Sequence, residues 1–118
     1  MPAYHNNMCI PLNAVSEKWC PGDKVEYSCT TSTRLVWSGT LFTGQCSDER
    51  ITISDSRTLE CGQMTATNII SPDPNFPQYT IIRSTLTFIA RAEMVGATVM
   101  CITPLRVTLD TTLNIRST

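Results

Sequence analysis

This chain has little charge, a single histidine and no long apolar run. Charged residues make up 16% of it, and the formal net charge is −1. Binding to nucleic acid or to an anionic membrane surface requires clustered Lys and Arg, whereas the basic residues here are scattered. No apolar stretch approaches the ~20 residues of a membrane-spanning helix. We therefore expect no nucleic-acid partner and no transmembrane segment within these 118 residues.

Catalytic constellations are missing as well. Hydrolases with a serine or cysteine nucleophile need a nearby base, and the only histidine is His5, beside Asn6-Asn7 near the start of the chain. The acidic residues that might suggest a glycosidase or a calcium site lack the spacing of either, so we interpret them as solvated loop charges: Asp48 with Glu49, Asp55 with Glu60, Asp73 and Asp110. We expect no enzyme activity, no catalytic residue, no metal and no cofactor.

What the sequence does have is cysteine. The six residues are Cys9, Cys20, Cys29, Cys46, Cys61 and Cys101, and no two of them form a Cys-x-x-Cys pair. This pattern argues against zinc and favours disulfides formed in an oxidising compartment. We therefore expect an extracellular domain.

Apolar and polar residues alternate with a period of two, which predicts a single domain of β-strands. The predicted strands cover 23–31, 33–38, 51–53, 79–90, a segment around 99–101, and 106–116. In the last strand, Val107, Leu109, Thr111, Leu113 and Ile115 share one side without interruption, so no bulge is expected. Three prolines predict a loop at 71–77. We expect one domain over 1–118, with 1–8 as a frayed N-terminal segment.

Four short motifs resemble strands of an immunoglobulin-superfamily domain of the variable or intermediate type. They are Gly22-x-x-Val25-x-Tyr27-x-Cys29, Leu35-x-Trp37, Ser84-Thr85-Leu86-Thr87-Phe88 and Gly96-Ala97-Thr98-Val99-Met100-Cys101. The resemblance implies an all-β fold, an immunoglobulin-like Greek-key sandwich of two sheets, in which a disulfide joins Cys29 to Cys101 and Trp37 packs against it. The residues expected in the core are Trp37, Leu35, Tyr27, Leu86, Phe88 and Val99.

The remaining cysteines suggest extra disulfides. Cys46 and Cys61 flank the predicted strand at 51–53, and pairing them would fix a connection that buries little of its own. Cys9 and Cys20 are then left to staple the first strand. Because six cysteines allow fifteen connectivities, this scheme is a hypothesis.

The chain departs from the usual family pattern in three places. Val99 stands where a tyrosine is common, the loop between Cys29 and Trp37 is short, and the last strand has no Phe/Trp-Gly-x-Gly motif. Together with the extra cysteines, the Cys20-Pro21-Gly22 opening resembles divergent surface immunoglobulin domains of marine invertebrates, particularly cnidarians, including allorecognition receptors.

Strand parity predicts where such a domain would bind. If Trp37 and Cys101 face the core, Val36, Met100 and Ile102 must face outward from two strands that are neighbours in this fold. We expect these three to form an exposed apolar patch, extended by Phe42 next to Leu41, and we expect the patch to contact a partner. The alternatives are that a strand, a loop or the N-terminal segment covers the patch, or that the anchors are Trp19 and Phe76.

The resemblance implies an extracellular recognition or adhesion domain of a cell-surface receptor. Its partner would be a protein on another cell, and resemblance to allorecognition receptors implies homophilic binding. Because Met1-Pro2-Ala3 does not begin a signal peptide, we expect a signal already removed and a membrane anchor outside these residues. The alternatives are a secreted binding protein for a soluble or microbial ligand, and a structural spacer domain.

Overall fold

Residues 18–116 are described by a computed structural model, and almost all of its regular structure is β-strand. In chain order the elements are β1 (Lys18–Trp19), β2 (Lys24–Thr31), β3 (Leu35–Ser38), the 3₁₀ turn η1 (Thr40–Phe42), β4 (Ile51–Ile53), β5 (Leu59–Cys61), β6 (Met64–Pro72), β7 (Thr80–Ile89), the 3₁₀ turn η2 (Ala92–Met94), β8 (Thr98–Ile102), β9 (Val107–Thr112) and β10 (Asn114–Ile115). Thr, Val and Ile dominate the long strands, as expected of side chains that pack well on a pleated surface.

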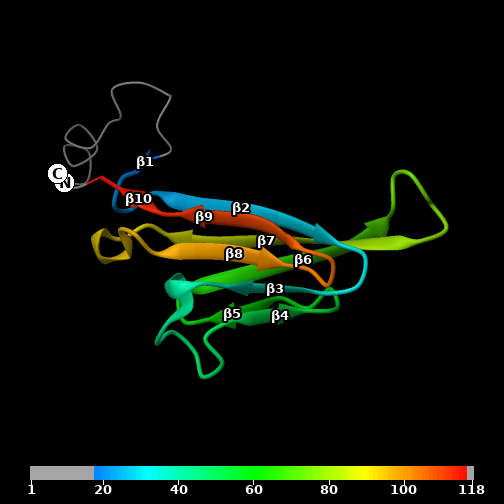
Figure 1. The fold of residues 1–118 in the computed structure, drawn as a ribbon, viewed down its shortest axis with the longest axis horizontal. Helices are drawn as coiled ribbons and strands as arrows, with labels where there is room; N and C mark the ends of the chain where they lie inside the picture. The colour runs from blue at the N-terminus through cyan, green and yellow to red at the C-terminus, as the bar shows by residue number, and fades with distance from the viewer. Residues whose placement is uncertain (1–17, 117–118) are drawn as a thin grey trace.

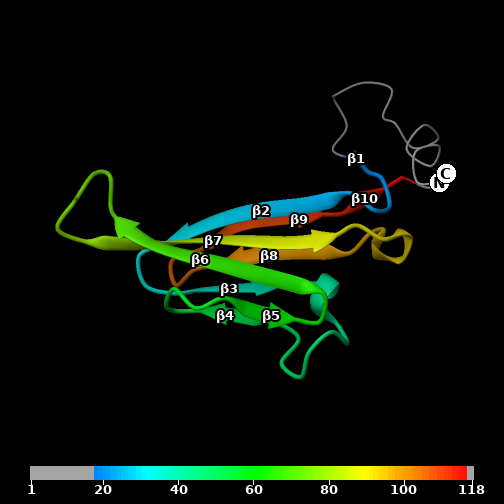
Figure 2. The same cartoon turned by 180° about the vertical axis from the view of Figure 1, so that it is seen from behind.

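The strands form two antiparallel four-stranded sheets packed face to face (Figures 1 and 2). One sheet has the order β2-β7-β6-β5 and the other the order β4-β3-β8-β9, while β1 pairs in parallel with β10. Between β2 and β9 the chain crosses from one sheet to the other three times, after β2, after β4 and after β7. The fold is an immunoglobulin-like β-sandwich, which confirms the predicted class.

The inward-facing residues of both sheets make one core. Five of the six predicted core residues are at most 2% exposed: Leu35, Trp37, Leu86, Phe88 and Val99. Tyr27, the sixth, is only partly buried, and its ring lies against Phe88 with centroids 6.3 Å apart. The predicted core is therefore confirmed, with Tyr27 at its margin.

A closed ring of four residues links the two sheets at the centre of this core. Trp37 on β3 is directly opposite Cys101 on β8, and Cys101 is disulfide-bonded to Cys29 on β2. Cys29 is opposite Ser84 on β7, and the Ser84 hydroxyl oxygen accepts a 2.9 Å hydrogen bond from the Trp37 indole N–H. The fully buried indole donor is thereby satisfied across the sandwich, by a residue whose role the sequence did not reveal.

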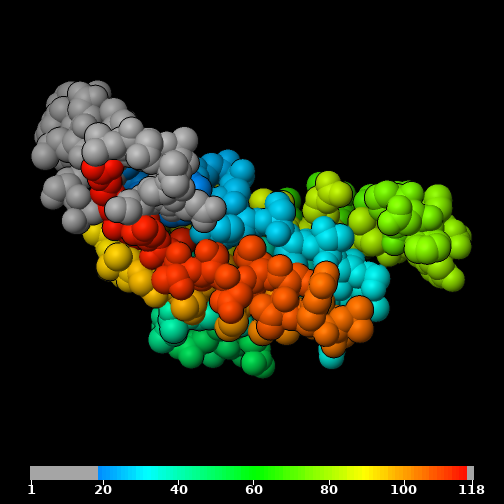
Figure 3. All heavy atoms as spheres, turned by 45° about the horizontal axis from the view of Figure 1, so that its top comes forward, coloured from blue at the N-terminus to red at the C-terminus, as the bar shows by residue number. Residues whose placement is uncertain are grey.

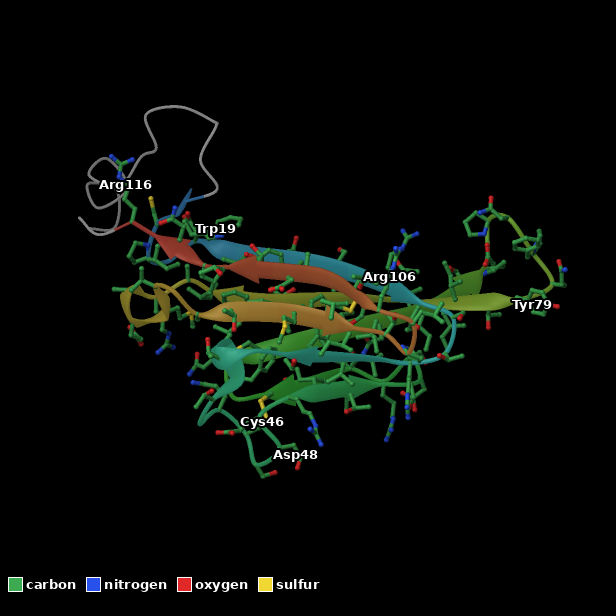
Figure 4. The ribbon with its side chains drawn as sticks, viewed as in Figure 1. Trp19, Cys46, Asp48, Tyr79, Arg106 and Arg116 are labelled. Carbon is green, nitrogen blue, oxygen red and sulfur yellow. A yellow bond between two sulfur atoms is a disulfide. The ribbon has the colours of Figure 1, made fainter. Side chains whose placement is uncertain are left out.

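One of the other two predicted disulfides is confirmed. Cys46 and Cys61 are bonded, which ties the long connection after η1 to the edge strand β5 (Figure 4). Cys20 is disulfide-bonded as well. Its predicted partner Cys9 lies outside the described residues, as does the predicted frayed segment 1–8.

Two strand predictions were wrong. Cys101 pairs with Leu109 but Ile102 pairs with Val107, so Thr108 is an extra residue and β9 has the bulge that unbroken parity argued against. The bulge turns Val107 outward and leaves Leu109 inward. The predicted loop at 71–77 also begins later, since β6 continues to Pro72, which pairs with Thr80. A proline is tolerated there because it ends the strand and its missing N–H breaks no interior ladder.

Replacing Ser84 tests the central ring. Ser84→Ala removes the acceptor of a buried indole N–H, and we expect the free energy of unfolding to fall by about 1–3 kcal/mol. The control is Thr85→Ala, the next residue on β7, whose side chain points to the outer face and should change stability by no more than about 0.5 kcal/mol. Urea denaturation measures both, and equal losses would contradict a structural role for the bond.

Candidate recognition face

The outer face of the β4-β3-β8-β9 sheet carries the predicted patch. Val36 on β3 is directly opposite Ile102 on β8, and Ile102 is opposite Val107 on β9. We call Val36, Ile102 and Val107 the apolar row. The predicted adjacency of Val36 and Ile102 is confirmed. Val107 was missed because its outward position depends on the bulge, which the alternation of the sequence conceals.

Met100 lies one step along the same face. It pairs with Ser38 on β3 and with Asp110 on β9, which makes it a diagonal neighbour of Val36. Val36, Met100 and Ile102 are partly buried by their neighbours, and Val107 is 48% exposed. The face is thus accessible, although less open than parity alone suggested. The N-terminal segment, which the sequence offered as a cover, lies outside the described residues.

Two arginines stand around the apolar row. A hollow of about 530 Å³ on this face is lined by Val36, Ile102, Arg34, Arg50, Ser38, Thr52, Thr103 and Pro104. Neither guanidinium forms an ion pair with any residue in the 18–116 range. The hollow therefore combines an apolar centre with cationic side chains whose charges are not neutralised within the described domain.

The prediction that Phe42 extends the exposed patch was wrong. It is 0% exposed, and Leu41 beside it is buried too, so neither can extend the outer patch or contact a partner. Both belong to η1, which turns the chain back over the end of the core. The parity of β3 did not continue past Gly39, because a 3₁₀ turn replaces the strand there.

The end of the face is held by an unusually close approach between Gly39 and β8. Gly39 has a φ of 121°, and a Cβ built on it would lie 2.2 Å from the carbonyl oxygen of Thr98. Next to it, the backbone N–H of Thr40 donates to the Thr98 hydroxyl, and the N–H of Thr98 donates to the Thr40 hydroxyl, at 2.9 and 2.8 Å. These bonds seat η1 against the start of β8.

The alternative anchors lie elsewhere. Trp19 is partly buried against the core beside β10, near one end of the sandwich (Figure 4). Phe76 is exposed in the loop between β6 and β7, near the other end. Neither joins the recognition face.

Three of the acidic residues considered for catalysis or calcium make local contacts. A Glu49 carboxylate oxygen accepts from the Gly44 N–H at 2.6 Å, and Asp73 accepts from the Asn75 N–H at 2.8 Å. The pKa of Asp55 is lowered by the backbone N–H of Arg57, which its carboxylate accepts, and by the Arg57 guanidinium. Between residues 18 and 116, no three His, Cys, Asp or Glu side chains gather as a potential metal site. His5 lies outside that range.

The part of the chain that the structure describes holds no helix of the length and hydrophobicity needed to cross a membrane. No protein-family model, no curated protein and no solved structure matches this chain. What the face binds must therefore be inferred from its own chemistry.

Gly39→Ala tests the close approach that ends the face. Gly96 is the control, because it also has a positive φ, 80°, but nothing lies within 4 Å of the added Cβ. We expect Gly96→Ala to lower the free energy of unfolding by about 1–2 kcal/mol, the cost of a left-handed conformation. Gly39→Ala should lose clearly more, since its Cβ also collides with backbone. Equal losses in urea denaturation would mean that β8 shifts freely.

Proposed function

We propose that this chain is an extracellular recognition domain of a cell-surface receptor, which binds a protein through the outer face of the β4-β3-β8-β9 sheet. The disulfides support an oxidising, extracellular setting. The observation that carries the proposal is the apolar row bordered by two arginines without ion-pair partners among the described residues. Protein interfaces combine apolar centres with Arg in this way, and Arg is frequent among the residues that dominate binding.

The order of residues across this face favours a second copy of the domain as the partner. The β3–β4 register, continued by one residue, sets Arg50 opposite Ser38, so that one row across the sheet contains Arg50, Ser38, Met100 and Asp110. A two-fold axis parallel to the strands, over the middle of the sheet, would bring Arg50 of one copy onto Asp110 of the other. The same axis would bring Val36 onto Ile102. The face is thus complementary to itself in both charge and apolarity, as an isologous interface requires.

Ile102→Lys tests the face at its centre. Association would bury an unpaired ammonium among apolar side chains, a cost of about 3–5 kcal/mol, so self-association should weaken by about 100-fold or more. The control is Thr85→Lys, which is also partly buried and lies on the outer face of the opposite sheet. Sedimentation equilibrium gives the association constants, and thermal unfolding checks that both variants are folded. If Ile102→Lys associates as strongly as Thr85→Lys, this face is not the homophilic surface.

A charge exchange tests the two-fold arrangement itself. Arg50→Asp and Asp110→Arg should each weaken self-association, because each places like charges opposite one another across the interface. The double variant restores opposite charges and should regain most of the lost affinity. A double variant weaker than either single variant would exclude this pairing of Arg50 with Asp110, even if the face binds in another orientation.

A further inference from the structure

The hairpin of β6 and β7 extends beyond the rest of the sandwich. β2 pairs with β7 only as far as Ile82, and β5 pairs with β6 only from Met64 to Ala66, whereas β6 and β7 continue to pair with each other up to Pro72 and Thr80. Figures 1 and 3 show this end of the hairpin standing out from the body. We call residues 69–82 the arm.

The arm is held in shape by its own hydrogen bonds. The backbone N–H of Asp73 donates to the carbonyl oxygen of Tyr79 at 2.9 Å, and the N–H of Tyr79 donates to that of Phe76 at 2.8 Å. The Asp73 carboxylate accepts from the Asn75 N–H. These bonds close the turn and keep the two strands in register, so the arm presents a formed strand edge.

The β6 edge of the arm is open over four residues, whereas on the other edge β2 leaves only Thr80 and Ile81 of β7 unpaired. The Asn68 side chain donates to the carbonyl oxygen of Arg57 at 2.6 Å, which fixes the preceding loop beside β6 at that point. Beyond Asn68, no described strand pairs with the outer edge of Ile69–Pro72. The Asp73–Tyr79 hydrogen bond sets the alternation along β6, so Ile70 and Pro72 are the residues of this segment whose backbone groups point to the open side. The N–H and C=O of Ile70 and the C=O of Pro72 are available to another strand, whereas Pro72 has no N–H to offer.

The open edge has less protection than the other sheet edges. Lys24 and Glu26 lie on the edge strand β2, Asp110 lies on β9, and β4 and β5 have three residues each. Charges, prolines and short strands are usual means of preventing edge-to-edge pairing. Ile69–Pro72 carries no charge, and its one protective residue is Pro72 at the end of β6.

Exposed apolar side chains gather on the arm. Of the eight large hydrophobic residues that are exposed in the described chain, four lie here: Ile69, Ile70, Phe76 and Tyr79. Figure 4 shows Tyr79 at the far end. Ile69 and Ile70 stand on opposite sides of the open edge, so an added strand would gain apolar contacts on both of its faces.

We propose that the open edge of the arm pairs, antiparallel, with the same edge of a second copy of this domain. A two-fold axis perpendicular to the strand sets the edge antiparallel to its own copy, and the uncharged Ile69–Pro72 segment meets no charge repulsion there. Because the arm projects, two domains can approach through it without contact between their bodies. This contact is distinct from the recognition face on the other sheet.

The two ends of the described chain lie far from the arm (Figures 1 and 2). β1 and β10 pair at the end of the sandwich opposite to the arm (Figures 1 and 2). A four-residue edge is a small contact, so pairing through the arm alone is weak and gains most where copies are held together on one surface. Combined with a second two-fold contact through the recognition face, it would link domains into open chains.

The test compares Ile69→Lys with Val95→Lys. Both parent side chains are 61% exposed, but Val95 lies after η2, away from the arm and from the recognition face. Each variant and the parent domain are studied by sedimentation equilibrium and by peptide-level amide hydrogen exchange over a wide range of concentration. In the parent and in Val95→Lys, deuterium uptake by residues 67–72 should fall as concentration rises. In Ile69→Lys, deuterium uptake by residues 67–72 should no longer depend on concentration. The part of the self-association that the arm contributes should also be lost.

Two results would overturn the proposal: exchange at 67–72 that is independent of concentration in the parent domain, or unchanged association in Ile69→Lys. If the true occupant of the edge is a strand of another protein, exchange at 67–72 will not depend on the concentration of the parent domain. Ile102→Lys separates this proposal from the recognition face, because it should leave the concentration-dependent protection of 67–72 intact. If Ile102→Lys has no effect on association while Ile69→Lys abolishes it, the arm pairs and the homophilic use of the face fails.

Discussion

The ring formed by Trp37, Ser84, Cys29 and Cys101 fixes the relation between the two sheets. Its covalent member joins β2 to β8, and its hydrogen bond joins β3 to β7, so both sheets are connected twice at the same level of the core. Closing a loop of 72 residues by a disulfide removes chain entropy from the unfolded state, worth about 4 kcal/mol in the loop-entropy model. The buried indole would otherwise carry an unsatisfied donor.

The register set by this ring decides the chemistry of the outer surfaces. Once Trp37 and Cys101 point inward, Val36, Met100 and Ile102 have no other side to occupy. An apolar outer face is therefore a direct consequence of strands that are apolar at consecutive positions, and such a face on an antiparallel sheet is stable in water only if it is small or covered. If the face binds a partner, burial of its apolar side chains would contribute to the affinity.

The segments that connect the strands give the two ends of the sandwich different structures. The Cys46–Cys61 bond holds a long segment that contributes little to the core, and η1 closes one end by placing Leu41 and Phe42 inside. At the other end, nothing in the described chain flanks the arm on both sides, because β2 and β5 are too short to follow β6 and β7. The two proposed contacts therefore lie on different sheets, and one can be altered without disturbing the other.

The sequence by itself determined that strands predominate, most of the named core residues and the outward direction of Val36, Met100 and Ile102, because alternation with a period of two is a local property of the chain. It did not predict β5 and β6. The pairing of Cys46 with Cys61 was a hypothesis suggested by their positions on either side of a short strand, and the structure confirms it. Tertiary structure alone decided the rest. Phe42 is buried because η1 folds over the core, and Val107 is exposed because a bulge at Thr108 reverses the parity of β9. The open edge of the arm depends on where neighbouring strands end, and the lengths of separate strands are not related by any local pattern in the sequence.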